Sequence, residues 1–362
     1  MNRYPRVVLT TGGTGGHIFP ALAVAEQLRE FEPEIELLFI GSQHGPEKGL
    51  AAEAGLTFIG LPVHGVLGRG IRAIGALAGI ARSIVRARRI LAKFEPDVVA
   101  GFGAYASMPA LVAAKSCKIP IAVHEQNAIP GLSNKLMGRL AGKIFLSLPD
   151  KANCFDPKKT LLTGNPVRKS IATLRGDASQ PKERPRLLVM GGSQGARAIN
   201  SAVLSSLPLL DGVFIHHQTG PADLERVRAG YAAHGFGPEQ AKVVPFISDM
   251  ADAYRQADLA LCRSGATTVA ELALAGKPAI FIPFPHATHD HQTANALAMV
   301  EAGAARMIQE QEIPTKDLAG IVLSLLHDHA ALDAMSAAAV RCANPRAAQD
   351  VARGILQLAM RT

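Results

Sequence analysis

The chain alternates between short apolar runs and longer stretches in which apolar residues recur with helical spacing. Such runs, bounded by turn residues, are typical of strands buried in a parallel sheet, and the helical stretches are typical of the connections between them. The pattern therefore predicts an α/β protein. The predicted strands lie at residues 6–10, 35–40, 58–61, 98–101 and 119–124 in the first half, and at 186–190, 213–217, 242–246, 258–262 and 279–284 in the second.

A sequence of strand, glycine turn and helix occurs twice, once from residue 6 and again from residue 186. This repetition predicts two similar Rossmann-like domains. We place the first domain at residues 1–164 and the second at residues 165–344, with a polar linker or loop at 175–185. The tail, residues 345–362, has a short helical pattern and is expected to pack back on the first domain.

The composition of the 362 residues narrows the class of protein. The four cysteines are scattered without a CxxC pair, which argues against a disulfide framework or a zinc site and fits a reducing cytoplasm. The N-terminus lacks the apolar core of a signal peptide, and no apolar run reaches the roughly 18 residues of a transmembrane helix. The net charge of +8 indicates anionic partners, which could be phosphates, nucleic acid or a lipid surface.

Residues 263–295 are predicted to form a turn, a helix and a further strand, directly after a buried strand. The Ser and Thr residues of the turn are expected to cap free N–H groups, and the helix is expected at residues 269–275. Free N–H groups and the helix dipole at that end attract anions. Glu271, expected in the first turn, can accept hydrogen bonds from the two hydroxyl groups of a ribose. The alternative is an acid that only complements the dipole.

Residues 12–17, GGTGGH, join the first predicted strand to the first helix. Glycines allow a tight turn and a close approach of the backbone to a ligand, although a tight turn without a ligand is the alternative. The spacing is not GxGxxG, so nicotinamide binding is disfavoured. His17 lies where the helix begins, a position that lowers the basicity of imidazole and leaves a neutral ring available as a base.

Small or polar residues also follow other predicted strands, at residues 101–107 and 124–127. Ligands of open parallel sheets bind at the carboxyl ends of the strands, so these clusters indicate a single cleft, with ordinary loop capping as the alternative. In the second half, Ser193 lies in a glycine turn and can donate to a phosphate. Residues 246–250 follow a strand, and their backbone groups either pair with the edge of a base or form a plain connection.

Between Glu53 and Glu95 the chain has no acidic residue. Four basic residues recur there on one helical stripe: Arg82, Arg86, Arg89 and Lys93. The apolar residues of the opposite face are expected to pack on the sheet: Leu77, Ile80, Ile84, Ala87 and Leu91. The basic stripe is either a solvated face or a site for anionic lipid headgroups. If it binds lipid headgroups, the whole 66–93 region is expected at the membrane. No aromatic residue interleaves the stripe, so nucleic acid is not an expected partner.

Eight motifs occur in the order seen in a known family: GGTGGHIFP, GFGAYAS, HEQNAIPGL, TGNPVR, GGSQGAR, FISDM, RSGATTVAEL and HDHQTANA. With these motifs, which span almost the whole chain, the sequence closely resembles the MurG family. The resemblance implies a GT-B fold, in which two Rossmann-like domains face a cleft. It also implies transfer of N-acetylglucosamine from UDP-GlcNAc to undecaprenyl-diphosphate-MurNAc-pentapeptide (lipid I), which gives lipid II. The implied location is peripheral, on the cytoplasmic face of the bacterial inner membrane.

The resemblance also assigns site residues. The positions that match the donor site of the second domain are Arg168 and Ser193 near the phosphates, Ile247 at the uracil, Ala266, Thr267, Thr268, Val269 and Ala270 at the helix start, Glu271 at the ribose, and Gln292 at the sugar hydroxyls. Four positions across the cleft match residues that line the donor and acceptor side, and they are also assigned to donor binding: Thr14, Gly15, Gly16 and Asn127. His17 matches the family's proposed base. Two positions depart from the family pattern: Ala104, where glycine is frequent, and His291, where some members carry glutamine.

We therefore interpret the chain as an inverting glycosyltransferase that needs no cofactor and no protein-bound metal ion. The chain has no Asp-x-Asp pair. Its one metal-like cluster is interpreted as a set of hydrogen-bonding groups: His286, His289, Asp290 and His291. Three alternatives stay open, namely a glycosyltransferase of the same fold acting on diacylglycerol, a nicotinamide-dependent oxidoreductase, and a non-catalytic membrane protein that binds a sugar nucleotide.

Overall fold

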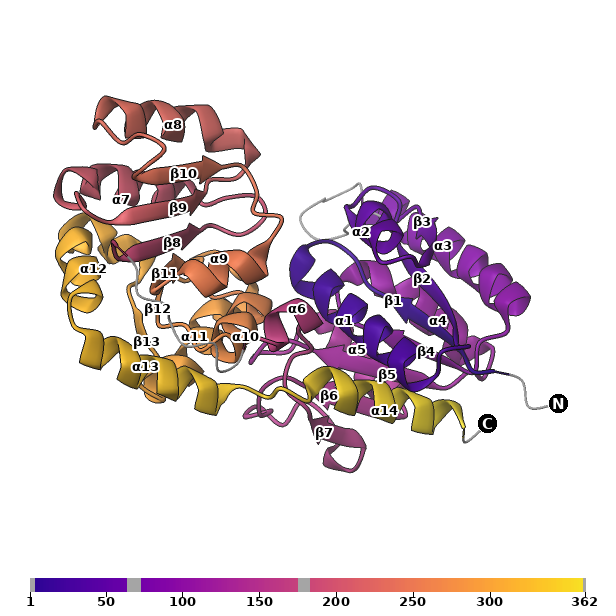
Figure 1. Cartoon of the computed structure of the whole chain (residues 1–362). Helices are drawn as coiled ribbons and strands as arrows, with labels where there is room; N and C mark the ends of the chain where they lie inside the picture. Colours follow the sequence, from indigo (N-terminus) through magenta and orange to yellow (C-terminus); the bar gives the residue numbers. More distant parts are fainter. Residues whose placement is uncertain (1–3, 64–72, 175–182, 361–362) are drawn as a thin grey trace. The chain divides into compact units, whose positions relative to one another are not determined.

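The computed structural model describes residues 4–63, 73–174 and 183–360, with the backbone alone at residues 73–78. The chain divides into two compact units (Figure 1). The N-terminal unit comprises Met1–Arg168 and Asn344–Thr362, and the C-terminal unit comprises Lys169–Ala343. The chain thus passes from one unit to the other twice, close to residues 164 and 344, where the sequence places the domain limits.

The N-terminal unit contains a seven-stranded parallel sheet in the order β3-β2-β1-β4-β5-β6-β7. Its strands are β1 (Arg6–Thr10), β2 (Glu36–Ser42), β3 (Thr57–Leu61), β4 (Val98–Gly101), β5 (Ile121–Glu125), β6 (Lys143–Leu146) and β7 (Thr160–Leu162). The direction of strand succession reverses between β1 and β4. Sheets of this kind bind ligands at that switch point, beyond the carboxyl ends of the strands.

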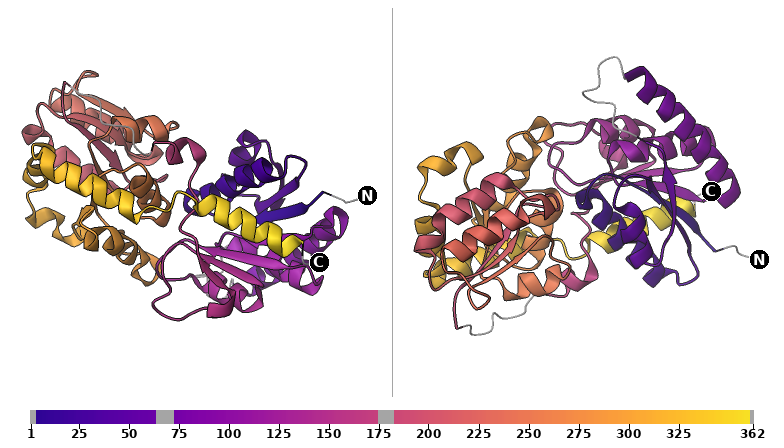
Figure 2. Two further views of the ribbon diagram at one scale, coloured as in Figure 1. Left: turned by 60° about the horizontal axis from the view of Figure 1, so that its bottom comes forward. Right: turned by 90° about the horizontal axis from the view of Figure 1, so that it is seen from above.

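Helices cover both faces of this sheet. One face carries α1 (Gly15–Phe31), α2 (Glu47–Glu53) and α14 (Ala347–Ala359), and the other carries α3 (Ala73–Phe94), α4 (Met108–Ser116) and α5 (Leu132–Leu140). Alternate residues of β1 serve the two layers, since Val7 and Leu9 join the first core and Val8 joins the second. The tail helix α14 buries its apolar face in the first core, beside α1 (Figure 2).

Helix α3 separates basic from apolar residues as the sequence predicts. All four residues of the predicted basic stripe are exposed. On the opposite side, Ala87 and Leu91 are buried in the core that includes the sheet, and Ile84 packs against that core. Ile80, also predicted on that side, is half-buried. Five other apolar residues of this region lie outside the described side chains: Val66, Leu67, Ile71, Ile74 and Leu77.

The C-terminal unit contains a six-stranded parallel sheet in the order β10-β9-β8-β11-β12-β13. Its strands are β8 (Arg186–Met190), β9 (Phe214–Gln218), β10 (Ala241–Val244), β11 (Leu259–Cys262), β12 (Ala279–Phe281) and β13 (Ala305–Met307). Its helices are α6 (Lys169–Ala172), α7 (Arg197–Ser206), α8 (Leu224–Ala233), α9 (Met250–Gln256), α10 (Ala266–Leu274), α11 (His291–Glu301), α12 (Leu318–Leu326) and α13 (His329–Cys342).

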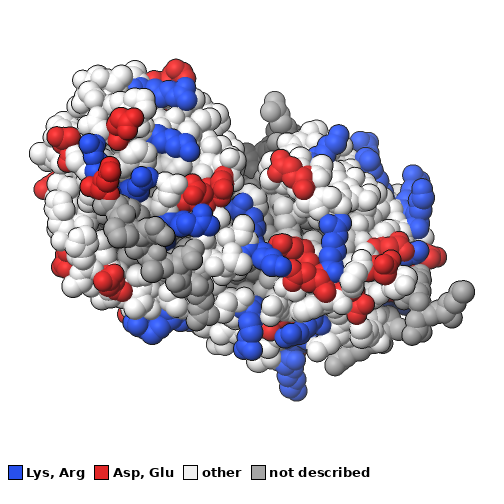
Figure 3. Space-filling view, viewed as in Figure 1, with Lys and Arg blue, Asp and Glu red and all other residues white. Residues whose placement is uncertain are grey.

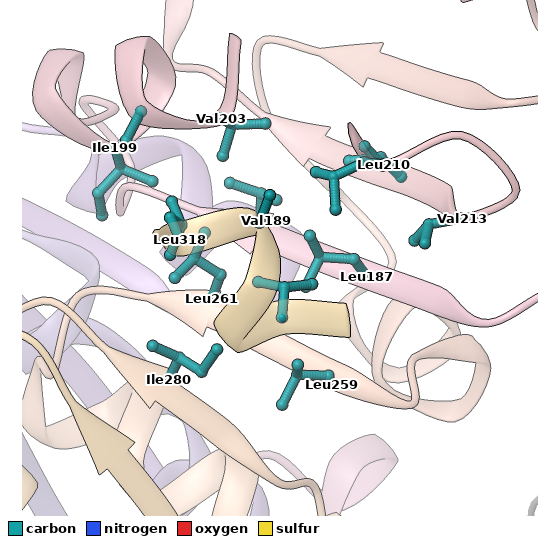
Figure 4. Close-up of a cluster of buried hydrophobic side chains, with 14 of the residues drawn as sticks. Leu187, Val189, Ile199, Val203, Leu210, Val213, Leu259, Leu261, Ile280 and Leu318 are labelled. Atoms are coloured by element: carbon teal, nitrogen blue, oxygen red, sulfur yellow. The ribbon is translucent and has the colours of Figure 1, made fainter. Parts of the chain in front are cut away.

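The core of the C-terminal unit forms where the central strands meet α7 and α12 (Figure 4). Leu187 and Val189 of β8 lie beside Leu259 and Leu261 of β11, and all four are buried. Leu318 of α12 packs in the same cluster. In strand order this sheet repeats the first six strands of the N-terminal sheet. The prediction of two similar Rossmann-like halves is therefore confirmed.

Two strands end earlier than predicted, and proline accounts for both. Strand β10 ends at Val244 rather than at residue 246, because Pro245 has no N–H group for the ladder. Strand β12 ends at Phe281 rather than at residue 284, shortly before Pro283. In the described part of the chain no single helix is long and apolar enough to cross a membrane, although the bent pair Leu318–Leu326 and His329–Ala359 together meets that measure of length and composition.

Candidate active site

The conformation of the glycine turn after β1, residues 12–16, is determined by packing and by a positive φ angle. Gly13 has a φ of +86°, and a Cβ at Gly12 would lie 2.4 Å from the Cβ of Ala106. The Gly13 N–H donates to Oε1 of Glu47 at 2.9 Å, and Glu47 is completely buried. Packing thus requires glycine at position 12 and the backbone conformation favours it at position 13, whereas a Cβ at Gly16 would meet only the hydroxyl of Thr14. Gly16 is half-buried at the start of α1.

His17 lies in the first turn of α1, which begins after Thr14. Its imidazole is half-buried, and Nδ1 lies 2.9 Å from Oε1 of Gln126. Gln126 follows β5, so the carboxyl ends of β1 and β5 bring these two side chains together. Thr14, Gly15, Gly16 and His17 therefore share one end of the sheet with the loop that carries Asn127.

Glu125, which the sequence reasoning does not single out, organises that loop. The carboxylate is buried, and its Oε1 accepts from the backbone N–H of Asn127 at 2.9 Å and from Nδ2 of Asn127 at 3.2 Å. Its Oε2 accepts from the Gly131 N–H at 3.0 Å and from Nδ2 of Asn134 at 2.8 Å. Four donors thus hold one carboxylate and fix the position of Asn127. An acid at the end of a buried strand is the signal that could have identified it.

Arg168 belongs to the N-terminal unit, at its boundary. Its guanidinium lies over the ring of Phe19 in α1, 4.3 Å from the ring centroid. This cation–π contact directs the Arg168 side chain to the beginning of α1. The remaining predicted donor residues, namely Ser193, Ile247, the α10 residues and Gln292, belong to the C-terminal unit.

The start of α10 differs from the prediction. The helix begins at Ala266 rather than at residue 269, its N-cap residue is Gly265, and no side chain caps it. The Ser264 hydroxyl instead donates to the backbone carbonyl of Gln292 at 2.8 Å. The expectation that Ser and Thr cap this turn is therefore wrong. Ala266, Thr267 and Thr268 form the first turn of the helix, before the first intrahelical bond, which runs from the Val269 N–H to the Gly265 carbonyl. The N-terminal end of a helix of this kind attracts anions.

Glu271 lies in the second turn of α10 and not in the first, so the prediction of its position is wrong by one turn. Its carboxylate is buried, and Oε2 accepts from the Tyr254 hydroxyl at 2.9 Å. Tyr254, also buried, comes from α9. An acid that only complemented the helix dipole would need neither burial nor a tyrosine partner. The arrangement favours a carboxylate held in place to bind hydroxyl groups.

Gln292 connects the loop after β12 to the beginning of α11. Its Oε1 accepts from the Phe284 N–H at 3.0 Å, so the amide directs its NH₂ donor away from that loop. Nδ2 of Asn295 donates to the Ser264 carbonyl at 3.2 Å, which connects α11 to the turn before α10. These bonds bring Gln292 beside the start of α10, and they leave it a donor for a sugar hydroxyl.

Gln218, at the end of β9, joins the other two predicted donor segments. Its Nε2 donates to the Gly192 carbonyl at 2.9 Å, next to Ser193, and its Oε1 accepts from the Ile247 N–H at 2.9 Å. The Ile247 N–H is therefore engaged within the protein and is not the group left to pair with a base. Ser193 is exposed in its glycine turn, where Gly192 has a φ of +87°. The sequence reasoning did not single out Gln218.

The histidine-rich loop forms local hydrogen bonds. Nδ1 of His291 lies 2.8 Å from the Thr288 carbonyl, and the Thr293 hydroxyl donates to Asp290 at 2.7 Å. In residues 4–63, 73–174 and 183–360, no group of three or more His, Cys, Asp or Glu side chains is placed to hold a metal ion. The sequence-based alternative of a zinc-like cluster therefore has no geometric support in this loop.

Ala104 has a φ of +59° and a ψ of 156°, a conformation that favours glycine. Replacing Ala104 with glycine is expected to stabilise the protein by about 1 kcal/mol, since the relieved strain of about 1–3 kcal/mol exceeds the entropic cost of glycine, about 0.5–1 kcal/mol. The measurement is the midpoint of urea unfolding. Ala302→Gly is the matched control, because Ala302 has an ordinary φ of −77°. A lower midpoint for Ala104→Gly than for the wild type would contradict the strain argument.

Comparison with known proteins places this geometry in a family. Residues 7–146 match the glycosyltransferase family 28 N-terminal domain, and residues 186–352 match the family 28 C-terminal domain. A UDP-N-acetylglucosamine–N-acetylmuramyl-(pentapeptide) pyrophosphoryl-undecaprenol N-acetylglucosamine transferase from Nitratidesulfovibrio vulgaris strain Hildenborough is 53% identical, over 98% of this chain and 97% of its own. The protein of the same name from Lawsonia intracellularis is 50% identical, over 98% and 97%.

Solved structures agree with these relatives. The crystal structure of Acinetobacter baumannii MurG superposes with a TM-score of 0.76 at 34% identity, covering 98% of this chain and 99% of that chain. A UDP-GlcNAc 2-epimerase from Neisseria meningitidis, bound to UDP-GlcNAc, has a TM-score of 0.67 at 15% identity, covering 99% of this chain and 100% of that chain. This second likeness concerns the fold alone.

Two parallel α/β units of one topology, each opening with a glycine turn, define a glycosyltransferase of the GT-B class. The predicted fold class is thereby confirmed. Within that class, the chain belongs to the MurG family, the N-acetylglucosaminyltransferases of glycosyltransferase family 28. This membership excludes the alternatives of a nicotinamide-dependent oxidoreductase and a non-catalytic binding protein.

Proposed function

We propose that the protein transfers N-acetylglucosamine from UDP-GlcNAc to undecaprenyl-diphosphate-MurNAc-pentapeptide, and so converts lipid I to lipid II. The observation that carries this proposal is the 53% identity, over 98% of the chain, to a relative whose name states this transfer. In the proposal the C-terminal unit binds the sugar nucleotide. The N-terminal unit binds the acceptor and faces the membrane.

Residues of the C-terminal unit are arranged to bind the donor from base to sugar. Ile247 lies at the uracil, and Glu271, held by Tyr254, accepts hydrogen bonds from the ribose hydroxyls. Ser193 and the first-turn N–H groups of α10 (Ala266 to Thr268) bind the diphosphate, together with Arg168 of the N-terminal unit. Val269 and Ala270 continue the helix, and the Val269 N–H donates to the Gly265 carbonyl at 3.0 Å. Gln292 donates to a hydroxyl of the sugar.

The proposed reaction is a single displacement. The acceptor oxygen forms a bond to the anomeric carbon while the bond from that carbon to the UDP oxygen breaks, so the configuration inverts. The proton of the acceptor hydroxyl passes to the imidazole of His17, and the electron pair of the broken bond leaves with UDP. Thr14, Gly15, Gly16 and Asn127 line the donor and acceptor side. Fixed N–H donors stabilise the charge on UDP without reorganising during the reaction.

Acceptor choice separates this proposal from a glycosyltransferase that acts on diacylglycerol. The experiment offers UDP-GlcNAc with either a lipid I analogue or diacylglycerol, in the same detergent. The proposal predicts sugar transfer to the lipid I analogue alone. Transfer to diacylglycerol alone would replace it with the alternative.

The membrane-facing surface is proposed to include α5 as well as the 66–93 region. The exposed leucines of α5 recur every four residues and form one stripe: Leu132, Leu136 and Leu140, with 62%, 38% and 37% of their surface exposed. Helices α3 and α5 both pack against α4, so this stripe and the basic stripe belong to one helical layer. Basic and acidic side chains are interspersed over the face drawn in Figure 3.

Changing Arg82, Arg86, Arg89 and Lys93 together to glutamine is expected to release the protein from anionic vesicles. Attraction to lipid headgroups is worth about 1 kcal/mol per basic residue and falls as salt rises. Turnover of a water-soluble acceptor is expected to persist. Cosedimentation with vesicles measures the release.

The control changes four exposed basic residues of the C-terminal unit to glutamine: Arg228, Lys242, Arg255 and Arg341. Equal vesicle binding by both variants and the wild type would support the solvated-face interpretation.

Transfer is expected to continue in excess EDTA, with metal-stripped protein and a soluble acceptor. The diphosphate charge is balanced by Arg168, by Ser193 in its glycine turn and by the start of α10, so the mechanism requires no protein-bound cation. The soluble acceptor removes any effect of magnesium on lipids. Activity that disappears with EDTA and returns with stoichiometric zinc or manganese would contradict this mechanism.

A further inference from the structure

A chain of three side chains extends from His17 into the N-terminal unit. Nδ1 of His17 lies 2.9 Å from Oε1 of Gln126, and Nε2 of Gln126 lies 3.0 Å from Nδ1 of His124. Gln126 and His124 are each 1% exposed. The donor-binding and base assignments above use neither residue, although both are buried directly behind the proposed base.

The surroundings of Gln126 determine which end of its amide faces His17. Nε2 lies 3.0 Å from the Phe102 carbonyl, and a carbonyl can only accept, so the NH₂ group must be at this position. The other end, Oε1, then faces His17. Because an amide oxygen can only accept, Nδ1 of His17 must carry the proton.

His124 fixes the same orientation from the other side. Its Nε2 lies 3.3 Å from the Gly164 carbonyl, so Nε2 carries a proton and Nδ1 accepts from Gln126. Burial lowers the pKa of His124 to about 4, although the bond to the Gly164 carbonyl opposes this shift. At neutral pH the ring is therefore uncharged, and its Nδ1 can only accept. A flipped Gln126 amide would leave Phe102 and His124 without a donor.

Gly103 lies over the bond between His17 and Gln126. A Cβ at this position would be 3.0 Å from Nδ1 of His17 and 3.3 Å from Oε1 of Gln126, and Gly103 has a φ of +88°. The glycine lets the backbone of this loop approach the pair closely. The hydrogen bond is thus enclosed on the side of β4 as well as on the side of β5.

We propose that Gln126, oriented by His124 and the Phe102 carbonyl, is a positioning residue that holds His17 in the tautomer protonated at Nδ1. The lone pair of the neutral ring is then on Nε2, the nitrogen that takes the proton of the acceptor hydroxyl. This inference deepens the proposed function and rests on the assignment of His17 as the base. It assigns no contact with substrate to Gln126 or His124.

Nitrogen NMR of protein labelled with ¹⁵N-histidine tests the tautomer directly and independently of turnover. The His17 signals are identified by their loss in His17→Gln. The wild type is expected to show a protonated Nδ1 and an unprotonated Nε2 at His17 when the ring is neutral. In Gln126→Met, which removes the acceptor, the His17 proton is expected to move to Nε2 or to be shared between the two nitrogens. A wild-type His17 protonated at Nε2, or a tautomer unchanged in Gln126→Met, would overturn the proposal.

Kinetics provide the second readout. Gln126→Met is expected to lower kcat on the order of 10- to 100-fold, part of the factor of about 10²–10⁴ that a general base supplies, and to leave the affinity for UDP unchanged. Gln126→Glu retains an oxygen that accepts from Nδ1–H. Its second oxygen replaces the NH₂ group that faces the Phe102 carbonyl and Nδ1 of His124, so burial beside these acceptors is expected to keep a proton on it. The variant is therefore expected to retain the wild-type tautomer of His17 and a kcat closer to that of the wild type than Gln126→Met has.

Gln126→Glu also tests the proposal if Gln126→Met does not fold. A His17 ring protonated at Nε2 in Gln126→Glu, although the acceptor for Nδ1–H is retained, would contradict positioning. The outcome is different if kcat is unchanged in His17→Gln while the wild type shows the expected His17 tautomer. That result would disprove the base assignment and leave the positioning of His17 by Gln126 intact.

Discussion

Replacing His17 with alanine is expected to lower kcat for sugar transfer by about 10²–10⁴-fold, the factor that a positioned general base supplies. The affinity for UDP is expected to stay close to that of the wild type, because His17 has no proposed contact with UDP. Steady-state kinetics with a soluble acceptor, together with calorimetry of UDP binding, measure both quantities. The effect is thus expected in the chemical step and not in donor binding.

The control for this prediction is His234→Ala. His234 is exposed in the C-terminal unit, where Nδ1 lies 2.8 Å from the Gly230 carbonyl, and it has no proposed role in the reaction. Wild-type kcat in His234→Ala with a large loss in His17→Ala supports the base. Near-normal kcat in His17→Ala would mean that another group, or water, accepts the proton.

Replacing Glu271 with alanine is expected to weaken UDP-GlcNAc binding by one to two orders of magnitude, because hydrogen bonds to a charged group contribute about 1.5–3 kcal/mol. Discrimination against a donor with 2′-deoxyribose is also expected to fall, since the variant cannot sense the missing hydroxyl. Calorimetry with UDP and with 2′-deoxy-UDP measures both effects.

Tyr254→Phe provides an intermediate case. It removes the hydroxyl that donates to Oε2 of Glu271 at 2.9 Å but retains the carboxylate and the ring. We expect it to weaken UDP binding less than Glu271→Ala does. Unchanged UDP affinity in Glu271→Ala would refute the ribose assignment and leave Glu271 as a buried partner of Tyr254.

The sequence predicts most of the fold, because buried parallel strands are apolar throughout and glycine turns mark their ends. The strands that it misses are β6, β7 and β13. Strands β7 and β13 have three residues each, which is too short for a pattern to emerge. Strand β6 is a short run that begins with a lysine. These strands are fixed by pairing with neighbours that are distant in the sequence.

The candidate site shows the same limit. His17, Asn127 and Glu271 can be found from the sequence because they follow strands or lie near a helix start. Gln126 contacts His17, Gln218 contacts Ile247 and Tyr254 contacts Glu271, at separations of 109, 29 and 17 residues, which no local pattern contains. The start of α10 was misplaced for this reason, since the Ser264 hydroxyl bonds to Gln292, 28 residues along the chain, instead of capping the helix.

The central claim is inverting transfer of N-acetylglucosamine to a MurNAc-bearing lipid diphosphate. The most direct measurement is the product formed from UDP-GlcNAc and a lipid I analogue, analysed by mass spectrometry and by proton NMR of the new glycosidic bond. Inverting transfer predicts that the lipid I analogue gains one N-acetylglucosamine and that one UDP is released per transfer. The α linkage of the donor is replaced by a β linkage to the MurNAc sugar. A retained α linkage, or UDP released without any glycosylated lipid, would contradict it.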